Sequence, residues 1–506
     1  MASANAQNTK EVEITGPDYI TDFADNYISA TGVSSNGQYV FGAMVGGEGP
    51  AAFYDITGGI PAVMLDPELE ETFGVNIAGI TYDNIVFVSE NNIVYTYNIT
   101  DGTKTYIKSP DEKLGLDVWD VNSDGMVIAG NLTDEMSEIS IPMYGVRQAD
   151  GTYKITTLEY DSKDIFGTEG QFTQARFLTE DGNNVIGVQI DARGMAPRLV
   201  VWEKQEDGTF KFTTPLDDII YDTTVEKPGK KPEFEDYVTA DKETDPELYE
   251  QQREEFNAAY TAYQEAFSAF TRNGSVLDVF KMHRGKRNNI IYAGYNTEEG
   301  TYPVLYNCDT DKAESYPDCM GYAFEDLPGG GIITFDDATG LCSLNAISED
   351  GTEMMFTEWL KEKTGVDLSS YYSVEMTNPM TGMVIEGVFP GLPFFSHDGK
   401  TLALSGLSGN FEYETGVYTF DRDIFAALAT GIGVNMVNEV TFGKNALNIG
   451  AGRQGTAEVY AMDGTLCDTF AINGTACFDG MLAAGAYIIK VSVEGAQPVS
   501  MKIIIK

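Results

Sequence analysis

The sequence is poor in the residues that most often carry catalysis and metal binding. Its 506 residues include two histidines, His283 and His397, and five cysteines. Histidine is the usual general base near neutral pH, and cysteines at ligand spacing would indicate a zinc site. The cysteines stand at positions 308, 319, 342, 467 and 477, and they have no such spacing. The chain therefore predicts no histidine-based catalytic centre and no structural metal site.

The cysteines also bear on the redox state of the chain. Five is an odd number, so at least one thiol has no partner within the chain. A Cys308–Cys319 or a Cys467–Cys477 disulfide would suit an oxidising compartment. Scattered cysteines are more often buried thiols, and we favour that state over the two bridges.

Positive charge is scarce. The chain has 32 lysines and arginines against 78 aspartates and glutamates, a formal net charge of −46. Such a chain repels phosphates, which excludes nucleic acid and anionic membrane as partners. The acidic residues are spread along the sequence and indicate a solvated anionic surface, with a cation-binding surface as the alternative. No run of eighteen apolar residues occurs, so we expect no membrane span.

Most of the chain repeats one pattern. Each unit has an apolar alternating strand, a polar turn, a second strand with small residues, and a short aromatic strand. The first copy has strands at residues 28–34, 39–42 and 51–55, with a turn at 35–37. Asn-Gly and Asp-Gly supply the positive φ of a two-residue hairpin turn, which is the turn we expect here.

The turns recur often enough to indicate the fold. They fall near positions 36, 83, 124, 181, 285, 350 and 398. A period of about 40–50 residues with four strands per unit is typical of a β-propeller. The sequence therefore predicts an all-β protein with a seven-bladed propeller over residues 27–425. An eighth unit would arise if residues 328–330 form a further turn of this kind. Residues 11–15, in the N-terminal segment 1–26, alternate and are expected to close the ring by pairing with the last unit.

A polar and helical insertion interrupts the repeats over residues 218–273. A helix is expected from Asp245, as N-cap, to about Arg272. Five aromatic residues recur along it at helical spacing: Phe256, Tyr260, Tyr263, Phe267 and Phe270. This stripe either packs on the propeller face or is an exposed surface for a partner. A shorter helix is expected over residues 358–363, ending at Gly365.

The C-terminal segment alternates in a different way. Residues 457–466 form one strand with a turn at Gly464, residues 482–491 form another around Gly485, and residues 501–506 are a β-branched strand ending on lysine. Period-two alternation broken by Asp-Gly and Ala-Gly predicts paired strands.

These features resemble the C-terminal sorting domain of cargo of the Bacteroidetes type IX secretion system. Six residues match the family pattern: Gly464, Leu482, Gly485, Tyr487, Lys502 and Lys506. The resemblance implies a small C-terminal β-sandwich over residues 435–506, the secretion machinery as partner, and an extracellular or outer-surface location. A domain boundary is then expected between Arg422 and Val440. Residues 2–7 are small, like a cleavage site that follows an export signal.

Candidate catalytic residues are few. Asp117, Asp120, Asp278 and Glu325 could line the central channel of a propeller, where such enzymes gather their carboxylates. Their spacing shows no pair at catalytic separation. Residues 396–398 read Ser-His-Asp, but consecutive residues point away from each other, so we interpret them as a polar turn.

Other motifs fit the repeat better than a ligand site. Residues 120–125 match the first half of a calcium loop, yet position 131, where a glutamate would complete the site, is asparagine. Residues 329–331 lack the Lys-Ser/Thr of a phosphate loop. Trp119 and Trp202 could stack on sugars, although core packing is the commoner use. We expect no cofactor, with calcium as the alternative.

The sequence as a whole predicts a binding protein. We expect a secreted or cell-surface propeller that binds a protein or glycan ligand. One alternative is an extracellular hydrolase or lyase with carboxylates at the channel mouth. Another is a structural component of the cell envelope. The sequence does not identify the ligand.

Overall fold

The fold is taken from a computed structural model of the chain. It describes residues 14–19, 28–44, 51–57, 60–64, 75–90, 93–134, 139–161, 172–190, 197–272, 275–285, 287–297, 299–336, 343–369, 372–377, 382, 384–407, 413–428, 441–443, 446–448, 454–461, 466–473, 475–477, 485–493 and 499–505. The chain divides into two compact units, Met1–Ile424 and Phe425–Lys506. The division lies at the start of the interval in which the sequence predicts a domain boundary.

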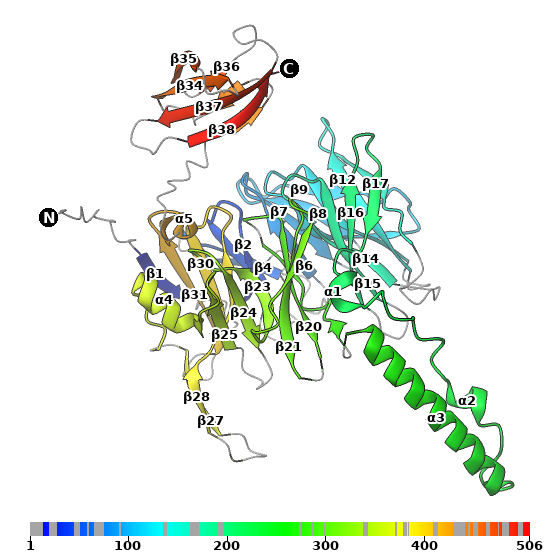
Figure 1. Cartoon of the computed structure of the whole chain (residues 1–506). Helices are drawn as coiled ribbons and strands as arrows, with labels where there is room; N and C mark the ends of the chain where they lie inside the picture. Colours follow the sequence, from blue (N-terminus) through cyan, green and yellow to red (C-terminus); the bar gives the residue numbers. More distant parts are fainter. Residues whose placement is uncertain are drawn as a thin grey trace. The chain divides into compact units, whose positions relative to one another are not determined.

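The first unit is built from antiparallel sheets of four or five strands (Figure 1). Its described residues form seven such sheets, of which six run in chain order. These six consist of β2 (Ile28–Val33), β3 (Tyr39–Met44), β4 (Ala51–Asp55) and β5 (Ile60–Met64); β6 (Val75–Ile80), β7 (Ile85–Glu90), β8 (Ile93–Asn98) and β9 (Lys104–Ile107); β10 (Gly115–Val121), β11 (Val127–Asp134), β12 (Ile139–Arg147) and β13 (Tyr153–Thr157); β14 (Phe172–Leu178), β15 (Asn184–Ile190), β16 (Arg198–Lys204) and β17 (Phe210–Thr213); β18 (Val276–Leu277), β19 (His283–Arg284), β20 (Ile290–Asn296), β21 (Thr301–Asn307) and β22 (Lys312–Ser315); β23 (Tyr322–Asp326), β24 (Ile332–Asp336), β25 (Ser343–Ile347) and β26 (Glu353–Met355).

The seventh sheet joins the two ends of the unit. It has the order β1 (Ile14–Tyr19), β31 (Tyr413–Phe420), β30 (Thr401–Leu407) and β29 (Pro390–Phe395). β1 pairs antiparallel with β31, as the closure prediction requires, but the described strand starts at Ile14. Residues 11–13 of the predicted strand lie outside the described residues. An N-terminal strand thus covers the edge that β31 would otherwise expose.

Hydrogen bonds between sheets connect this seventh sheet to the first. The Ser405 hydroxyl on β30 accepts from the Ala30 amide on β2 at 2.7 Å. A similar bond recurs elsewhere, where the Asn131 side chain on β11 accepts from the Ala175 amide on β14 at 3.0 Å. In both cases a side chain on the second strand of one sheet is hydrogen-bonded to the first strand of the next sheet. Consecutive sheets are therefore neighbours, and the last sheet is a neighbour of the first.

Four of the turns between first and second strands share one geometry, which differs from the predicted one. The Ser34 amide donates to the Tyr39 carbonyl at 2.8 Å, and the Gly37 amide donates to the Ser34 carbonyl at 2.9 Å. The loop therefore encloses four residues, and the two-residue turn expected from the sequence is wrong. Within this loop, which the structure describes throughout, only Gly37 has positive φ, at 70°, whereas a two-residue type I′ turn needs two such residues. The same pair of bonds recurs at Gly125, Gly182 and Gly399.

The turn at residues 328–330 adds no further sheet. It connects β23 to β24, whereas the turn at Gly351 connects β25 to β26 of the same sheet. The sequence pattern includes the turn at Gly351 among the repeated turns. Since the turn at residues 328–330 connects the first and second strands of its sheet, it is the one that corresponds to the repeated turn in the other sheets.

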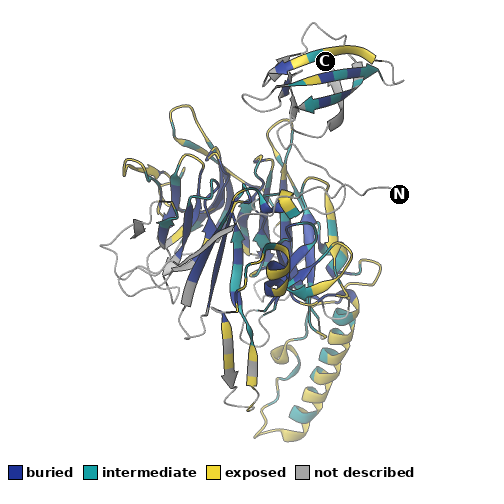
Figure 2. Cartoon of the chain, turned by 90° about the vertical axis from the view of Figure 1, so that its left-hand side faces the viewer, coloured by how far each residue is buried: buried dark blue, intermediate teal, exposed yellow. Residues whose placement is uncertain are grey.

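The insertion forms three helices, α1 (Asp217–Ile220), α2 (Phe234–Tyr237) and α3 (Pro246–Phe270). As predicted, the Asp245 side chain caps α3 by accepting from the Leu248 amide, and Pro246 is its first residue. The aromatic stripe is covered mainly by the insertion itself. The Phe256 ring lies 5.3 Å from Phe234 and 6.0 Å from Tyr237, both on α2. Figure 2 shows an exposed face along the rest of α3.

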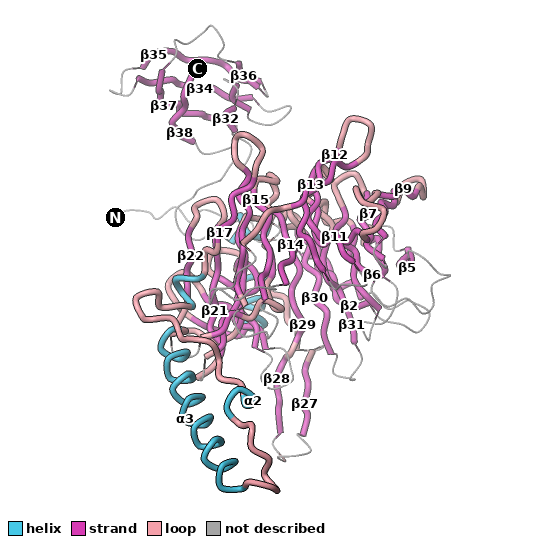
Figure 3. Tube along the Cα trace, turned by 90° about the vertical axis from the view of Figure 1, so that its right-hand side faces the viewer, coloured by secondary structure: helices cyan, strands magenta, loops and turns pink. Residues whose placement is uncertain are grey.

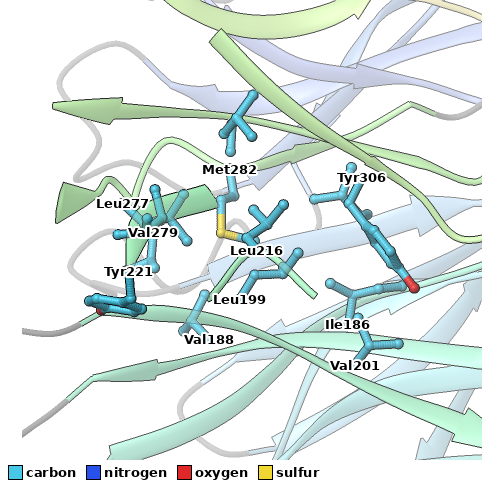
Figure 4. Close-up of a cluster of buried hydrophobic side chains, with 14 of the residues drawn as sticks. Ile186, Val188, Leu199, Val201, Leu216, Tyr221, Leu277, Val279, Met282 and Tyr306 are labelled. Carbon is cyan, nitrogen blue, oxygen red and sulfur yellow. The ribbon is translucent and has the colours of Figure 1, made fainter. Parts of the chain in front are cut away.

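Only the C-terminal end of the stripe reaches the core. Phe270 is fully buried and stacks on Tyr221 at 5.6 Å. Both belong to an apolar cluster between the β14–β17 and β18–β22 sheets, in which Met282 and Leu216 lie near the centre of Figure 4. Neither of the two alternatives describes the whole stripe, because Phe270 packs in the core and Phe256 packs on α2. The C-terminal end of α3 is anchored in the core by Phe270. Nearer the middle of α3, Phe256 packs within the insertion, because α2 supplies Phe234 and Tyr237 as its aromatic partners.

Three smaller elements complete the first unit and its end. α4 (Phe356–Thr364) starts two residues before the predicted helix and ends at Gly365, whose φ is 79°. β27 (Ser373–Thr377) and β28 (Val384–Val388) form a separate hairpin (Figure 3). α5 (Ile424–Leu428) follows β31.

The second unit contains one ladder of seven strands. Its order is β32 (Thr441–Gly443), β33 (Ala446–Asn448), β36 (Thr475–Cys477), β35 (Leu466–Asn473), β34 (Gln454–Ala461), β37 (Gly485–Val493) and β38 (Val499–Ile505). Of the sorting-signal residues, Gly485 and Tyr487 lie on β37 and Lys502 lies on the paired strand β38. Gly464, Leu482 and Lys506 lie outside the described residues. The small β-sandwich stays a prediction.

Two further expectations concern disulfide bridges and membrane-spanning segments. Cys308 and Cys319 are free thiols, and Cys467 forms no disulfide, so the two bridges considered from the sequence are not formed. Burial raises the pKa of the Cys308 thiol to about 12. Within the described residues, no helix is long and apolar enough to cross a membrane.

Candidate functional site

The candidate site lies on the first strands of the sheets. Contacts join β6 to β10, β10 to β14, β19 to β23 and β29 to β2, so these strands line the inside of the arrangement. Five of the first strands share a bulge at one register position. The residues at the bulge are Thr31, Ala78, Trp119, Arg176 and Phe324. Bulges re-aim side chains and are common beside functional sites.

Two of these bulge residues form a cluster with an exposed phenylalanine. The Arg176 guanidinium carbon lies 5.2 Å from the centre of the Trp119 ring and 5.7 Å from that of Phe280. We call this set the Trp119–Arg176–Phe280 cluster. Phe280 is 73% exposed and Trp119 36%, whereas Arg176 is 9% exposed. The cluster therefore offers two aromatic faces with a largely covered cation between them.

Backbone and side-chain bonds hold the cluster in place. Arg176 Nη1 donates to the Val279 carbonyl at 2.8 Å, which ties β14 to the segment that carries Phe280. Trp119 Nε1 donates to Asp117 Oδ2 at 2.7 Å. Burial lowers the pKa of Arg176 from its ordinary value, but the guanidinium stays protonated. The cluster is thus preorganised, which reduces the entropy lost when a ligand binds.

Asp120 is a buried structural residue. Arg284 Nε lies 2.8 Å from Asp120 Oδ2, with side-chain exposures of 5% and 7%. The same carboxylate accepts from the Leu178 amide at 3.0 Å. Asp120 therefore joins β10, β14 and β19, which belong to three different sheets. Asp120 Oδ1 accepts in turn from Arg284 Nη2 at 3.1 Å and from the Val121 amide at 2.9 Å. Because both oxygens are hydrogen-bonded, Asp120 is not available as the base that the enzyme alternative requires.

Glu325 is buried on β23 and is held in its protonated form near neutral pH. Burial, with the neighbouring Asp326 as a smaller cause, raises the pKa of Glu325 to about 8. Its Oε1 accepts from the Asp326 amide at 3.0 Å. A cavity of about 10 Å³, lined in part by Glu325 and His283, has room for no more than one water. Glu325 thus has a strongly raised pKa, and the cavity that it lines is too small for a substrate.

An aromatic group fills the interior next to Glu325. The His283 ring stacks on Phe324 at 4.3 Å and lies 6.0 Å from Phe394. These residues come from β19, β23 and β29. Side chains therefore close this part of the interior, and His283 serves as a packing residue.

The two remaining predicted carboxylates are also hydrogen-bonded to other groups of the chain, and Asp117 connects β10 to Ser89 on β7 of the preceding sheet. Asp117 accepts from the Ser89 hydroxyl and from Trp119, and Asp278 accepts from the Phe280 amide at 3.1 Å. No hydrogen bond in the described parts of the chain joins two of the four candidate carboxylates. Asp117 and Asp120 lie on β10, Asp278 lies between β18 and β19, and Glu325 lies on β23, so the structure does not assemble them into a catalytic pair.

The other sequence motifs have structural roles. Ser396 Oγ donates to Asp398 Oδ1 at 2.6 Å within the β29–β30 turn, and the His397 ring lies 6.1 Å from Tyr82. The Ser-His-Asp run is therefore a turn, as predicted. Trp202 is fully buried and donates to the Glu159 carbonyl at 2.8 Å, so it is a core residue. The calcium-like segment is the end of β10 and its turn, with the Asp120 carboxylate bound by Arg284.

Sequence reasoning missed Arg176, Phe280 and Arg284. A usable signal existed for the first, because Trp119 and Arg176 each stand five residues before the aspartate of their turn. Aligning the repeats on that aspartate, and on Asn36 in the first repeat, puts Thr31, Ala78, Trp119 and Arg176 at one position. Phe280 and Arg284 had no such signal, since this first strand is split into β18 and β19, with Phe280 between them and Arg284 on β19.

Comparison with known proteins identifies no family for the chain. No family model matches the chain, and no curated protein matches it in sequence. An oligogalacturonate lyase from Vibrio parahaemolyticus aligns over 81% of this chain and 98% of its own, with 11% identity and a TM-score of 0.44. A catalytically inactive virginiamycin B lyase from Staphylococcus aureus, solved with quinupristin, aligns over 81% of this chain and 99% of its own, with 12% identity and a TM-score of 0.38. A Dos1 propeller aligns over 78% of this chain and 93% of its own, with 8% identity and a TM-score of 0.35.

The strands of the described residues make this chain an all-β protein. The three alignments have TM-scores below 0.5 and add no argument about its architecture. Identities of this size transfer no activity, substrate or partner. The function has to be argued from the residues of this chain.

Proposed function

We propose that the chain is a seven-bladed β-propeller that acts as a binding module outside the cell. In this proposal each sheet of four or five strands is one blade, and the C-terminal unit is a small β-sandwich that directs export. The ligand contacts the Trp119–Arg176–Phe280 cluster. The resemblance of the C-terminal residues to the type IX sorting domain supports an extracellular or outer-surface location.

The exposed cluster is the observation that carries the proposal. Tryptophan and arginine are enriched at the residues that dominate protein interfaces, and aromatic side chains supply large contact area. Phe280 keeps 73% of its surface exposed although it stands among the inner strands. This composition favours a protein partner. A glycan that stacks on Trp119 is the alternative ligand.

The enzyme alternative has weaker support. Asp120 is bound by Arg284, and the cavity that Glu325 lines is too small for a substrate. Asp117 accepts from Ser89 and Trp119, and Asp278 accepts from the Phe280 amide. A hydrolase or lyase would need at least one carboxylate that faces a substrate. An envelope component without a ligand would in turn not need an exposed aromatic cluster on inner strands.

A binding experiment with matched variants tests the proposal. The full chain is immobilised, and fractionated outer-surface proteins and glycans of the producing cell are passed over it. The control is Ile93→Ala, which removes a side chain that is 55% exposed on the third strand of another sheet. We expect the bound fraction to dissociate about tenfold faster from Phe280→Ala than from the wild type or the control. Equal dissociation from all three proteins would show that the cluster is not the binding site.

A turnover screen tests the alternative. Polysaccharide and ester substrates are incubated with the full chain, with and without calcium. We expect no product. Reproducible product formation that is lost in Asp117→Asn or Asp278→Asn would establish the enzyme instead.

A further inference from the structure

A second cavity lies away from the Trp119–Arg176–Phe280 cluster. It is a groove of about 660 Å³ between the β6–β9 and β10–β13 sheets, lined by their outer strands and turns. One wall carries Thr96, Asn98 and Thr105 from β8 and β9, and the other carries Arg147 and Tyr153 from β12 and β13. This volume lies within the range of sites that hold small organic ligands.

A small residue at one register position explains why the groove is open. Phe87 on β7 pairs with Thr96 on β8, and the equivalent pair in the next sheet is Ala129 with Tyr144. Tyr144 fills the space between its sheet and the following one, where its ring lies 5.0 Å from Phe210. Threonine at the same position is too short to do this, so the space beside Thr96 stays empty.

The turn next to the groove also differs from the corresponding turn of the following sheet in the tyrosine that its glycine carbonyl binds. The Tyr144 hydroxyl reaches across to the Gly182 carbonyl of the next sheet at 3.1 Å. The equivalent carbonyl, that of Gly125, accepts at 2.5 Å from Tyr153, which belongs to the same sheet as Gly125. The groove therefore remains open without leaving this carbonyl unsatisfied, which makes it a stable feature of the fold.

Its polar groups are held in fixed positions. Asp101 Oδ1 accepts from the Thr103 amide at 2.9 Å, and Asp150 Oδ1 accepts from the Thr152 amide at 3.0 Å. Bonds from these threonines lower the pKa of both aspartates, so each is an ionised acceptor at neutral pH. Arg147 makes no ion pair with any described residue, and its donors are available to a ligand.

We propose that the groove binds a neutral oligosaccharide. Sugar hydroxyls both donate and accept, which matches carboxylates, threonine hydroxyls and a guanidinium on facing walls. The Tyr106 ring at the rim is 61% exposed and gives an apolar face for the carbon side of a sugar ring. Four aspartates line the groove, at positions 83, 101, 124 and 150, against the two cations Lys108 and Arg147, and this excess of negative charge disfavours an acidic glycan. This site is independent of the cluster in the proposed function.

The test places a tyrosine in the groove, because Tyr144 fills the corresponding space beside the β10–β13 sheet. Thr96→Tyr introduces the residue found at the equivalent position, and Thr156→Tyr on β13, which is exposed and outside the groove, is the matched control. The probes are neutral glucose, mannose and xylose trisaccharides, added to the full chain and followed by calorimetry. We expect at least one to bind the wild type and Thr156→Tyr alike, and to bind Thr96→Tyr about tenfold more weakly or not at all. Arg147→Ala, at an exposed position, should weaken the same ligand without affecting folding.

Several results would overturn the inference. One is equal binding of the trisaccharide by the wild type and Thr96→Tyr, and another is no binding of any neutral trisaccharide. A third is that the wild type prefers an acidic trisaccharide or a tripeptide and that Thr96→Tyr no longer binds this ligand. Trp119→Ala should leave trisaccharide binding unchanged, so a failure here is distinct from a failure of the proposed function.

Discussion

Replacing Asp120 with alanine should destabilise the first unit more than replacing an exposed aspartate. The change leaves Arg284, which is 4% exposed, without its nearest counter-charge and removes the acceptor of the Leu178 amide. Breaking a buried ion pair from one side costs about 3–5 kcal/mol. Glu180 Oε2 lies 3.9 Å from Arg284 Nη1 and can offset part of this cost, so we expect the lower half of that range.

Urea unfolding followed by tryptophan fluorescence measures this effect. All three tryptophans, Trp119, Trp202 and Trp359, belong to the first unit, so the signal reports on that unit. The control Asp124→Ala removes an exposed carboxylate that accepts from the Met126 amide, and it should cost about 1 kcal/mol or less. The double variant Asp120→Leu with Arg284→Met should recover much of the loss, because it leaves no unpaired buried charge. A loss below about 1 kcal/mol for Asp120→Ala would refute the role given to Asp120 as the connection between three sheets.

Three further predictions concern Glu325, β1 and the C-terminal unit. Because the pKa of Glu325 is raised from 4.5 to about 8, the folded chain holds a proton that the unfolded chain lacks between these values, so stability should fall as pH rises through this window. Glu325→Gln should reduce that fall in urea unfolding at pH 5, 7 and 9, and an unchanged fall would contradict the assignment. Deleting residues 1–19 removes β1 and exposes the edge of β31, which should cost several kcal/mol, and a melting temperature within about 2 °C of the intact chain would disprove closure by β1. Deleting residues 435–506 should leave a folded first unit inside the producing cell, and normal secretion would remove the basis for the sorting role.

The repeated strands were readable from the sequence because alternation and turn glycines are local signals. The turn glycines at 37, 125, 182 and 399 all have positive φ, and the sequence located each of them. The loop length was not readable, because Asn-Gly and Asp-Gly serve a four-residue loop as well as a two-residue turn. α3 and its cap were predicted for the same local reasons, but its packing partner α2 was not, since α2 has only four residues.

The candidate site was harder to predict because it depends on contacts between distant segments. Asp120 and Arg284 are 164 positions apart, and nothing near either residue in the sequence indicates the other. Four carboxylates were assigned to the channel on residue type alone, and the structure shows that two of them are buried among inner strands. Arg176 could have been found from the repeat, whereas Phe280 required the three-dimensional arrangement.

Acrylamide quenching of tryptophan fluorescence tests the central claim most directly. Trp119 is 36% exposed, whereas Trp202 and Trp359 are 0% and 3% exposed, so quenching of the folded chain reports mainly on Trp119. Binding of the ligand isolated on the immobilised chain should protect this fluorescence, and Trp119→Phe should remove the quenchable component. Saturated binding with unchanged quenching of the wild type would show that the ligand lies elsewhere, and the proposed role of the cluster would be wrong.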